Sequence, residues 1–154
     1  HRGIGPVRFY QGFTAEIIDS VDEKRQERLE KVREAVERIS EDKKLVLVDG
    51  VGYPAVGSVA GVSNADMAKH LHAPVLMVGR SGIGDAIDSL NLGLAFFEKH
   101  HVTVLGAVFN NIPLQVSYHS YDSCKEYVSK YMKKHLAHLG FYGSILRNEA
   151  EWKL

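Results

Sequence analysis

The segment VTVLGAVFNN, residues 102–111, carries the clearest structural signal in the chain. It is apolar at nearly every position from Val102 to Phe109 and stops at the polar pair Asn110-Asn111. Strands that are apolar on both faces are typical of parallel sheets, because helices cover both sides of such sheets. The segment therefore predicts a buried parallel strand that ends at Asn110.

Two earlier segments share this pattern. Leu45-Val46-Leu47-Val48 ends at Asp49-Gly50, and the run PVLMV at residues 74–78 ends at Gly79. A further short strand is predicted at residues 141–146, and helices are predicted at residues 21–44, 63–70, 85–100 and 118–138. Because strands and helices alternate, the chain is predicted to be α/β, with three layers formed by a mostly parallel sheet and helices on both of its faces.

Length and composition limit the classes of function. The 154 residues, 45% of them hydrophobic, suit a single domain spanning residues 1–154. Lys+Arg and Asp+Glu number 19 each, so no net charge favours nucleic acid. No apolar run reaches the roughly 20 residues that a membrane span requires. These properties predict a cytoplasmic protein that binds neither nucleic acid nor membranes.

Cysteine and histidine give little sign of catalysis or metal binding. Cys124, the single cysteine, lies on the apolar side of a predicted helix, where a core position is expected. Three pairs of histidines, at 70 and 72, 100 and 101, and 135 and 138, lack the spacing of a metal site. We expect these six side chains to lie at solvent-facing helix ends.

Functional sites of parallel sheets lie at the carboxyl ends of the strands. Asp49 ends the first predicted strand, where a carboxylate can hold Mg²⁺ or its water shell, and Gly50 and Gly52 allow the backbone to approach a ligand closely. The alternative is an ordinary turn that begins at Asp-Gly.

The second strand end carries Arg80, Ser81 and Gly82, which lead into a predicted helix. Such a loop can cradle a phosphate, because the N-terminus of a helix binds anions. Asp85 and Asp88 are expected in the first turn, however, where they complement the helix dipole and repel phosphate. We expect these two acids to cap the helix, while Arg80, Ser81 and Gly82 stay candidate ligand contacts.

Asn110 and Asn111 follow the third strand. A carboxamide both donates and accepts hydrogen bonds, so an Asn side chain can pair with the N6 and N7 edge of adenine. Turn formation before Pro113 is the alternative.

The order of these segments resembles the dethiobiotin synthetase-like family of P-loop proteins. The resemblance is carried by VLVDGVGYPAVGSVAGVSNADMAKHLHAPVLMVGRSGIGDAIDSLNL at residues 46–92 and by VTVLGAVFNNI at residues 102–112. The family includes the cobyrinic acid amidating synthases and a domain fused ahead of some phosphate acetyltransferases. Weaker similarity extends the match from about Gly12 to Leu146.

The resemblance implies ATP and Mg²⁺ as cofactors and an adenine nucleotide as partner. Asp49 takes the place of an acidic residue, commonly Glu, that is associated with Mg²⁺, and Asn110 matches the family's adenine-reading Asn. Residues 80–84 match the loop that, in the synthetases, shapes the side of the site where the acceptor substrate binds. In the synthetases a carboxylate attacks the γ-phosphate to give an acyl phosphate, which an amine then captures.

The front of the family pattern is not found in this sequence. The phosphate-binding pattern G-x-x-x-x-G-K-[ST] occurs nowhere in the 154 residues, and G-x-G-x-x-G is also absent. By resemblance, His1 is an internal start, and the domain is partial and not catalytic alone. In the family the P-loop strand lies in the middle of the sheet, and its absence would leave the neighbouring strands with an exposed edge. We expect an N-terminal segment, residues 7–10 or a second copy of the chain to cover this edge. A non-catalytic regulatory or oligomerisation domain is the alternative function.

Overall fold

The computed structural model describes residues 17–18, 21–114 and 120–147, and the chain divides into two units. Unit 1 comprises residues 1–73 and 99–102, and unit 2 comprises residues 74–98 and 103–154. Each unit contains its own cluster of buried hydrophobic side chains. That residues 1–154 form one domain stays a prediction, and the expected role of residues 7–10 lies outside the described residues.

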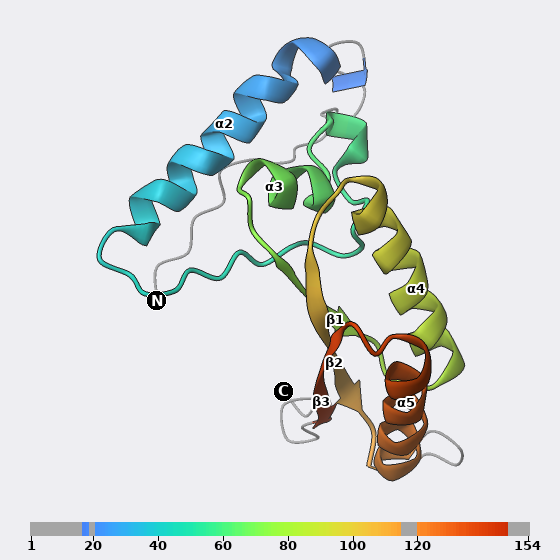
Figure 1. Cartoon of the computed structure of the whole chain (residues 1–154). Coiled ribbons are helices and arrows are strands. Elements are labelled where there is room, and N and C mark those ends of the chain that lie inside the picture. Colours follow the sequence, from blue (N-terminus) through green and yellow to red (C-terminus); the bar gives the residue numbers. More distant parts are fainter. Residues whose placement is uncertain (1–16, 19–20, 115–119, 148–154) are drawn as a thin grey trace, which may run out of the picture. The chain divides into compact units, whose positions relative to one another are not determined.

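Unit 2 contains a parallel sheet whose strands lie in the order β1-β2-β3 (Figure 1). These strands are β1 (Val75–Gly79), β2 (Val104–Ile112) and β3 (Gly140–Leu146). β2 pairs in parallel with both of its neighbours. The predicted α/β fold with a parallel sheet is confirmed, and the strand predicted from residues 102–109 is its central strand, although it begins at Val104 and continues past the predicted end at Asn110 to Ile112.

Two helices connect these strands and share one hydrophobic core. They are α4 (Gly84–Lys99), between β1 and β2, and α5 (Tyr121–His135), between β2 and β3. The buried side chains of the core come from α4, β2 and α5: Ala86, Leu90, Ala107, Phe109, Ile112, Cys124, Val128 and Met132. Because residues of both helices pack in one cluster with β2, α4 and α5 cover the same face of the sheet. Cys124 is fully buried there, which confirms the core position expected for it.

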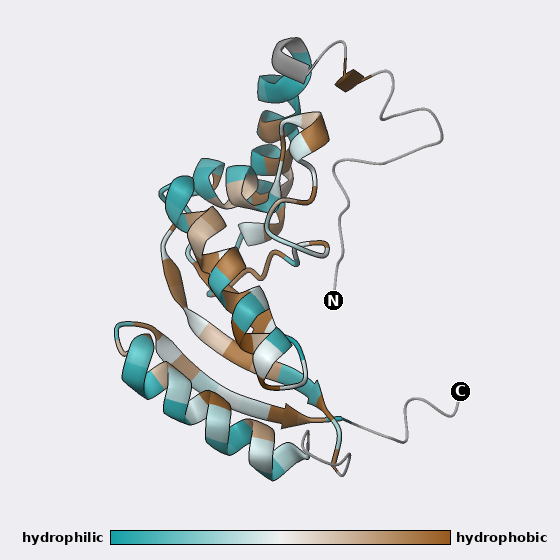
Figure 2. Cartoon of the chain, turned by 90° about the vertical axis from the view of Figure 1, so that its right-hand side faces the viewer, coloured by the Kyte–Doolittle hydropathy of each residue, from teal (hydrophilic) through white to brown (hydrophobic). Residues whose placement is uncertain are grey.

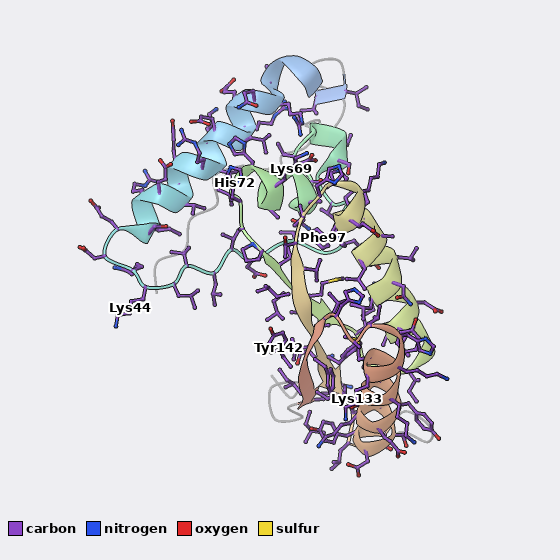
Figure 3. The ribbon with its side chains drawn as sticks, viewed as in Figure 1. Lys44, Lys69, His72, Phe97, Lys133 and Tyr142 are labelled. Atoms are coloured by element: carbon purple, nitrogen blue, oxygen red, sulfur yellow. The ribbon has the colours of Figure 1, made fainter. Side chains whose placement is uncertain are left out.

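The other face of this sheet carries exposed hydrophobic side chains. Met77 on β1 and Phe141 on β3 pack against the core, whereas their neighbours point the opposite way because side chains alternate along a strand. Leu76 and Val78 on β1 are 48% and 65% exposed. Tyr142 on β3 projects from the sheet on the side away from α5 (Figure 3).

The described part of unit 1 includes α2 (Val21–Ser40), the short 3₁₀ turn η1 (Ser58–Ala60) and α3 (Asn64–His70). Most of α2 is hydrophilic (Figure 2), but Leu29 and Val32 are buried on one stripe. Leu29 packs with Ala60 and Val62 of the loop around η1. α2 is therefore a largely solvated helix with one narrow apolar stripe, and this stripe packs on the loop around η1. Across the part of the chain that the structure describes, every helix is too short or too polar to cross a membrane.

The strand predicted at Leu45–Val48 is wrong. Residues 45–50 have no strand hydrogen bonding, and Leu45 and Leu47 are 74% and 84% exposed. A strand exists only where a neighbouring strand pairs with its main chain. The described residues provide no such partner for this segment, so its apolar pattern is not sufficient to form a strand.

We predict that Leu90→Ala lowers the free energy of unfolding by about 2–5 kcal/mol, because truncation leaves a cavity in the unit 2 core. Leu92→Ala is the matched control on the same helix, since Leu92 is 74% exposed. Its effect is expected within about 0.5 kcal/mol of zero. Urea denaturation measures both values, and equal losses in the two variants would contradict this packing.

Candidate functional site

The candidate residues are divided between the two units. Asp49, Gly50 and Gly52 belong to unit 1, whereas Arg80–Gly82 and Asn110–Asn111 belong to unit 2. Within unit 2, Gly79 of β1 and Phe109 of β2 are register partners. Arg80 and Asn110 are the residues that follow this shared rung. The structure therefore brings the second and third candidate groups to the same edge of the sheet, at its carboxyl end.

Asn110 and Asn111 form an irregular step in β2. Both residues are exposed, although Phe109 before them and Ile112 after them are each only 1% exposed. The side-chain Oδ1 of Asn110 accepts a hydrogen bond from the main-chain N–H of Asn111 at 2.8 Å. Asn111 has a left-handed backbone with φ of 60°. The donor end of the Asn110 carboxamide lies on this exposed edge, which suits recognition of a ligand.

The loop after β1 carries Arg80, Ser81 and Gly82, and Gly82 has a φ of 104° that few other residues adopt. Arg80 Nη1 lies 3.7 Å from Asp85 Oδ2, and both side chains are exposed. An exposed ion pair of this kind contributes at most about 1 kcal/mol. Loss of this ion pair therefore costs little stability.

Helix α4 confirms only part of the expected capping. Asp85 lies in the first turn of the helix, as predicted. Asp88 does not, because the helix begins at Gly84 and Asp88 is further along its exposed side. One carboxylate, that of Asp85, therefore lies in the first turn of α4, whereas the sequence predicts two.

In unit 1, Asp49 lies in an exposed segment outside any helix or strand. Gly50 packs against Asn64, since a Cβ atom at residue 50 would lie 3.2 Å from Asn64 Oδ1. Gly52 adopts a left-handed φ of 66°. The two glycines thus serve the local turn, and that observation fits both the turn and the ligand-binding interpretation of this segment.

Asn64 organises the loop after Asp49, and sequence analysis missed it. Its Nδ2 donates to the main-chain oxygens of Val51 at 2.9 Å and Tyr53 at 2.7 Å. One carboxamide thereby fixes the backbone that follows Asp49 and Gly50. No sequence pattern indicates this role, because these contacts span 11 to 13 residues along the chain.

A capping box at the start of α3 holds the other end of the loop. The Ser63 hydroxyl accepts from the Asp66 main-chain N–H at 3.1 Å, and the Asp66 carboxylate accepts from the Ser63 main-chain N–H at 3.0 Å. Arg25 of α2 adds an ion pair to Asp66 at 2.9 Å. The sequence signal for this box is Ser63-Asn64-Ala65-Asp66, which matches the S/T-x-x-E/D pattern.

This network lowers the pKa of Asp66. Burial by itself raises that pKa, but hydrogen bonds from Ser63 and the contact with Arg25 outweigh burial, so the pKa lies below its ordinary 3.8. Arg25 Nε also donates to the Gly61 carbonyl at 2.8 Å, and Arg28 donates to the Ala60 carbonyl at 3.0 Å. These contacts join α2 to the loop that follows Asp49.

The histidine prediction is partly wrong. His72, His101, His135 and His138 are exposed, as expected. His70 and His100 are instead partly buried beside carboxylates, with their Nε2 atoms 3.6 Å from Glu30 and 4.0 Å from Asp66. In the described ranges, no three His, Cys, Asp or Glu side chains are grouped to hold a metal ion.

Two comparisons with known proteins bear on these residues. A family model described as "AAA domain" matches residues 4–140. The chain is also similar to the ATP-dependent dethiobiotin synthetase BioD of Methanococcus vannielii, with 29% identity over 109 residues. That similarity covers 71% of this chain and 51% of the relative, so the chain spans about half the length of the curated relative that it matches.

We predict that Asp66→Asn lowers the free energy of unfolding at pH 7 by about 1 kcal/mol, the usual worth of a helix cap. Because folding lowers the pKa of Asp66, the wild-type advantage is complete above the unfolded value of 3.8. This stability advantage is lost as the pH falls through the lower pKa that Asp66 has in the folded protein. Urea denaturation between pH 2 and pH 7 measures it, with Asp88→Asn as the exposed control; a difference independent of pH would contradict the network.

Proposed function

The chain belongs to the AAA-domain family of dethiobiotin synthetase-like proteins, and on that premise we propose that it forms part of a nucleotide-binding domain for ATP- and Mg²⁺-dependent ligase chemistry. The observation that carries the proposal is the exposed carboxamide of Asn110 at the carboxyl end of the central strand. That edge is where parallel sheets bind their ligands.

Asn110 has the chemistry required to read adenine. Its Nδ2 can donate to N7, and the second lone pair of Oδ1 can accept from the N6 amino group. The neighbouring Arg80 and Ser81 are exposed after β1 and provide donors beside the Asn110 carboxamide along the same edge. We assign the side chain of Asn110, together with the main chain of Asn111 beside it, to the base, and Arg80, Ser81 and Gly82 to the bound ligand.

Asp49 fits the way in which proteins hold Mg²⁺ beside a nucleotide. One or two carboxylates are sufficient there, because phosphate oxygens and water supply the other ligands. Asp49 is an exposed carboxylate, and Gly50 and Gly52 leave the adjacent backbone uncovered by side chains of their own. We therefore assign Asp49 of unit 1 to Mg²⁺, and this assignment is independent of the base contacts proposed for unit 2.

Catalysis by this chain acting alone is not part of the proposal. The pattern G-x-x-x-x-G-K-[ST], whose backbone and Lys cradle phosphates, is not found among these 154 residues. Reaction therefore requires phosphate contacts from a longer protein. BioD, the relative, is about twice as long as the matched region, since the match covers 51% of it.

A non-catalytic regulatory or oligomerisation domain is the second candidate. It is favoured by the exposed hydrophobic side chains of Leu76 and Val78 on one face of the unit 2 sheet. Monomeric proteins rarely expose clusters of such residues without a binding role. A second copy or a segment of a longer protein would cover them. A pure oligomerisation domain has no need of Asn110, and this difference separates the two candidates.

We predict that Mg-ATP raises the melting temperature of the 154-residue chain only slightly and that Asn110→Ala removes the increase. When the nucleotide concentration equals Kd, the stabilisation is about 0.4 kcal/mol. For a chain of this size that corresponds to roughly 1–2 °C. Differential scanning fluorimetry with each variant compared with its own nucleotide-free sample measures the increase.

Asn91→Ala is the matched control. Asn91 lies on α4 and donates to the Tyr131 hydroxyl at 2.9 Å, away from the strand ends. This variant can change the baseline stability, but its nucleotide-dependent increase is expected to equal that of wild type. An equal increase in melting temperature in wild type and Asn110→Ala would contradict the assignment of Asn110 to adenine. An increase as large as that of an intact P-loop enzyme would contradict the reliance on outside phosphate contacts.

A further inference from the structure

Asn111 produces a β-bulge beside the proposed base-reading residue. Phe109 pairs with Ser144 and Ile112 pairs with Leu146, so three steps along β2 correspond to two along β3. The additional residue is accommodated where Asn111 takes its left-handed φ of 60°. Bulges re-aim side chains, and a left-handed backbone is most often taken by Gly. Asn is one of the few other residues that tolerate this backbone.

The bulge is held firmly on both sides. Phe109 and Ile112 are each 1% exposed and belong to the hydrophobic core of unit 2. After the bulge, the main-chain N–H of Arg147 donates to the Ile112 carbonyl at 2.7 Å. The backbone of residues 110–111 is therefore fixed by its neighbours, although the two side chains themselves are exposed.

The Asn111 main chain also fixes the orientation of the Asn110 carboxamide. Its N–H donates to Asn110 Oδ1 at 2.8 Å. A carboxamide turned by 180° would place its NH₂ group against this N–H, which sets two donors against each other. The carbonyl end thus stays toward the main chain of Asn111, and the NH₂ end stays away from it.

We infer that Asn111 is a positioning residue that makes the site prefer a 6-aminopurine over a 6-oxopurine. This inference rests on the proposed function, in which Asn110 contacts the base. In the fixed orientation, Nδ2 donates to N7 and the free lone pair of Oδ1 meets position 6. An amino group at position 6 donates to that lone pair, whereas an oxo group presents a second acceptor and repels it.

The test compares Mg-ATP with Mg-ITP, which differ in the group at position 6 of the purine. Dissociation constants come from ligand-observed NMR on the whole chain, a method suited to weak binding. Wild type is expected to prefer ATP by roughly tenfold, within the usual range for a bidentate base contact. Asn111→Gly keeps both the N–H and the left-handed backbone, so its preference is expected to stay within twofold of wild type.

Asn111→Val is the disruptive variant, because β-branched residues avoid positive φ. Its ATP-to-ITP preference is expected to fall to about one, since the carboxamide of Asn110 is free to turn. A merely structural role would weaken both nucleotides equally and leave the ratio unchanged. If circular dichroism finds Asn111→Val unfolded, Asn111→Ala provides the same comparison with a smaller side chain.

The outcomes separate this inference from the proposed function. An unchanged ratio in the Val or Ala variant, together with loss of binding in Asn110→Ala, overturns the role of Asn111 and leaves the adenine site in place. Binding of neither nucleotide by wild type, or wild-type binding by Asn110→Ala, overturns the proposed function and this inference with it. Loss of preference in Val and its retention in Gly supports both.

Discussion

β2 pairs with a strand on each side, and the architecture of unit 2 depends on this arrangement. Its main chain pairs with that of β1 along one edge and with that of β3 along the other. Its side chains Ala107, Phe109 and Ile112 form the centre of the core beneath α4 and α5. Because the two pairings are parallel, each return of the chain requires a helix, and all three strands end at the same edge.

This constraint explains why polar side chains can gather on an otherwise apolar strand. The buried residues Phe109 and Ile112 hold β2 in place, so the two asparagines between them are exposed on a rigid backbone. Gly79 of β1 pairs with Phe109 of β2. The next residues along the two strands are Arg80 and Asn110, which therefore lie side by side along the sheet edge. A ligand that meets this edge finds donors already oriented, and less conformational entropy is lost on binding.

The sequence was sufficient to predict those elements that a local pattern determines. The apolar run at 102–109 and the helical periodicity of residues 85–100 both correspond to observed elements, β2 and α4. Leu45–Val48 has the same apolar pattern as β2 but no partner among the described residues, and a strand depends on its partner. The bulge at Asn111 and the loop contacts of Asn64 also escaped prediction, since each depends on residues distant in the chain.

The central claim is that the carboxyl edge of β1 and β2 binds the base of an adenine nucleotide. A ¹⁵N-labelled sample of the wild-type chain titrated with Mg-ATP tests it most directly through amide chemical shifts. The account predicts that the largest shifts occur at the main-chain amides of residues 80–82 and 110–111 and at the side-chain amide of Asn110. Shifts confined to other segments, such as α2, or no shifts at millimolar nucleotide would contradict it.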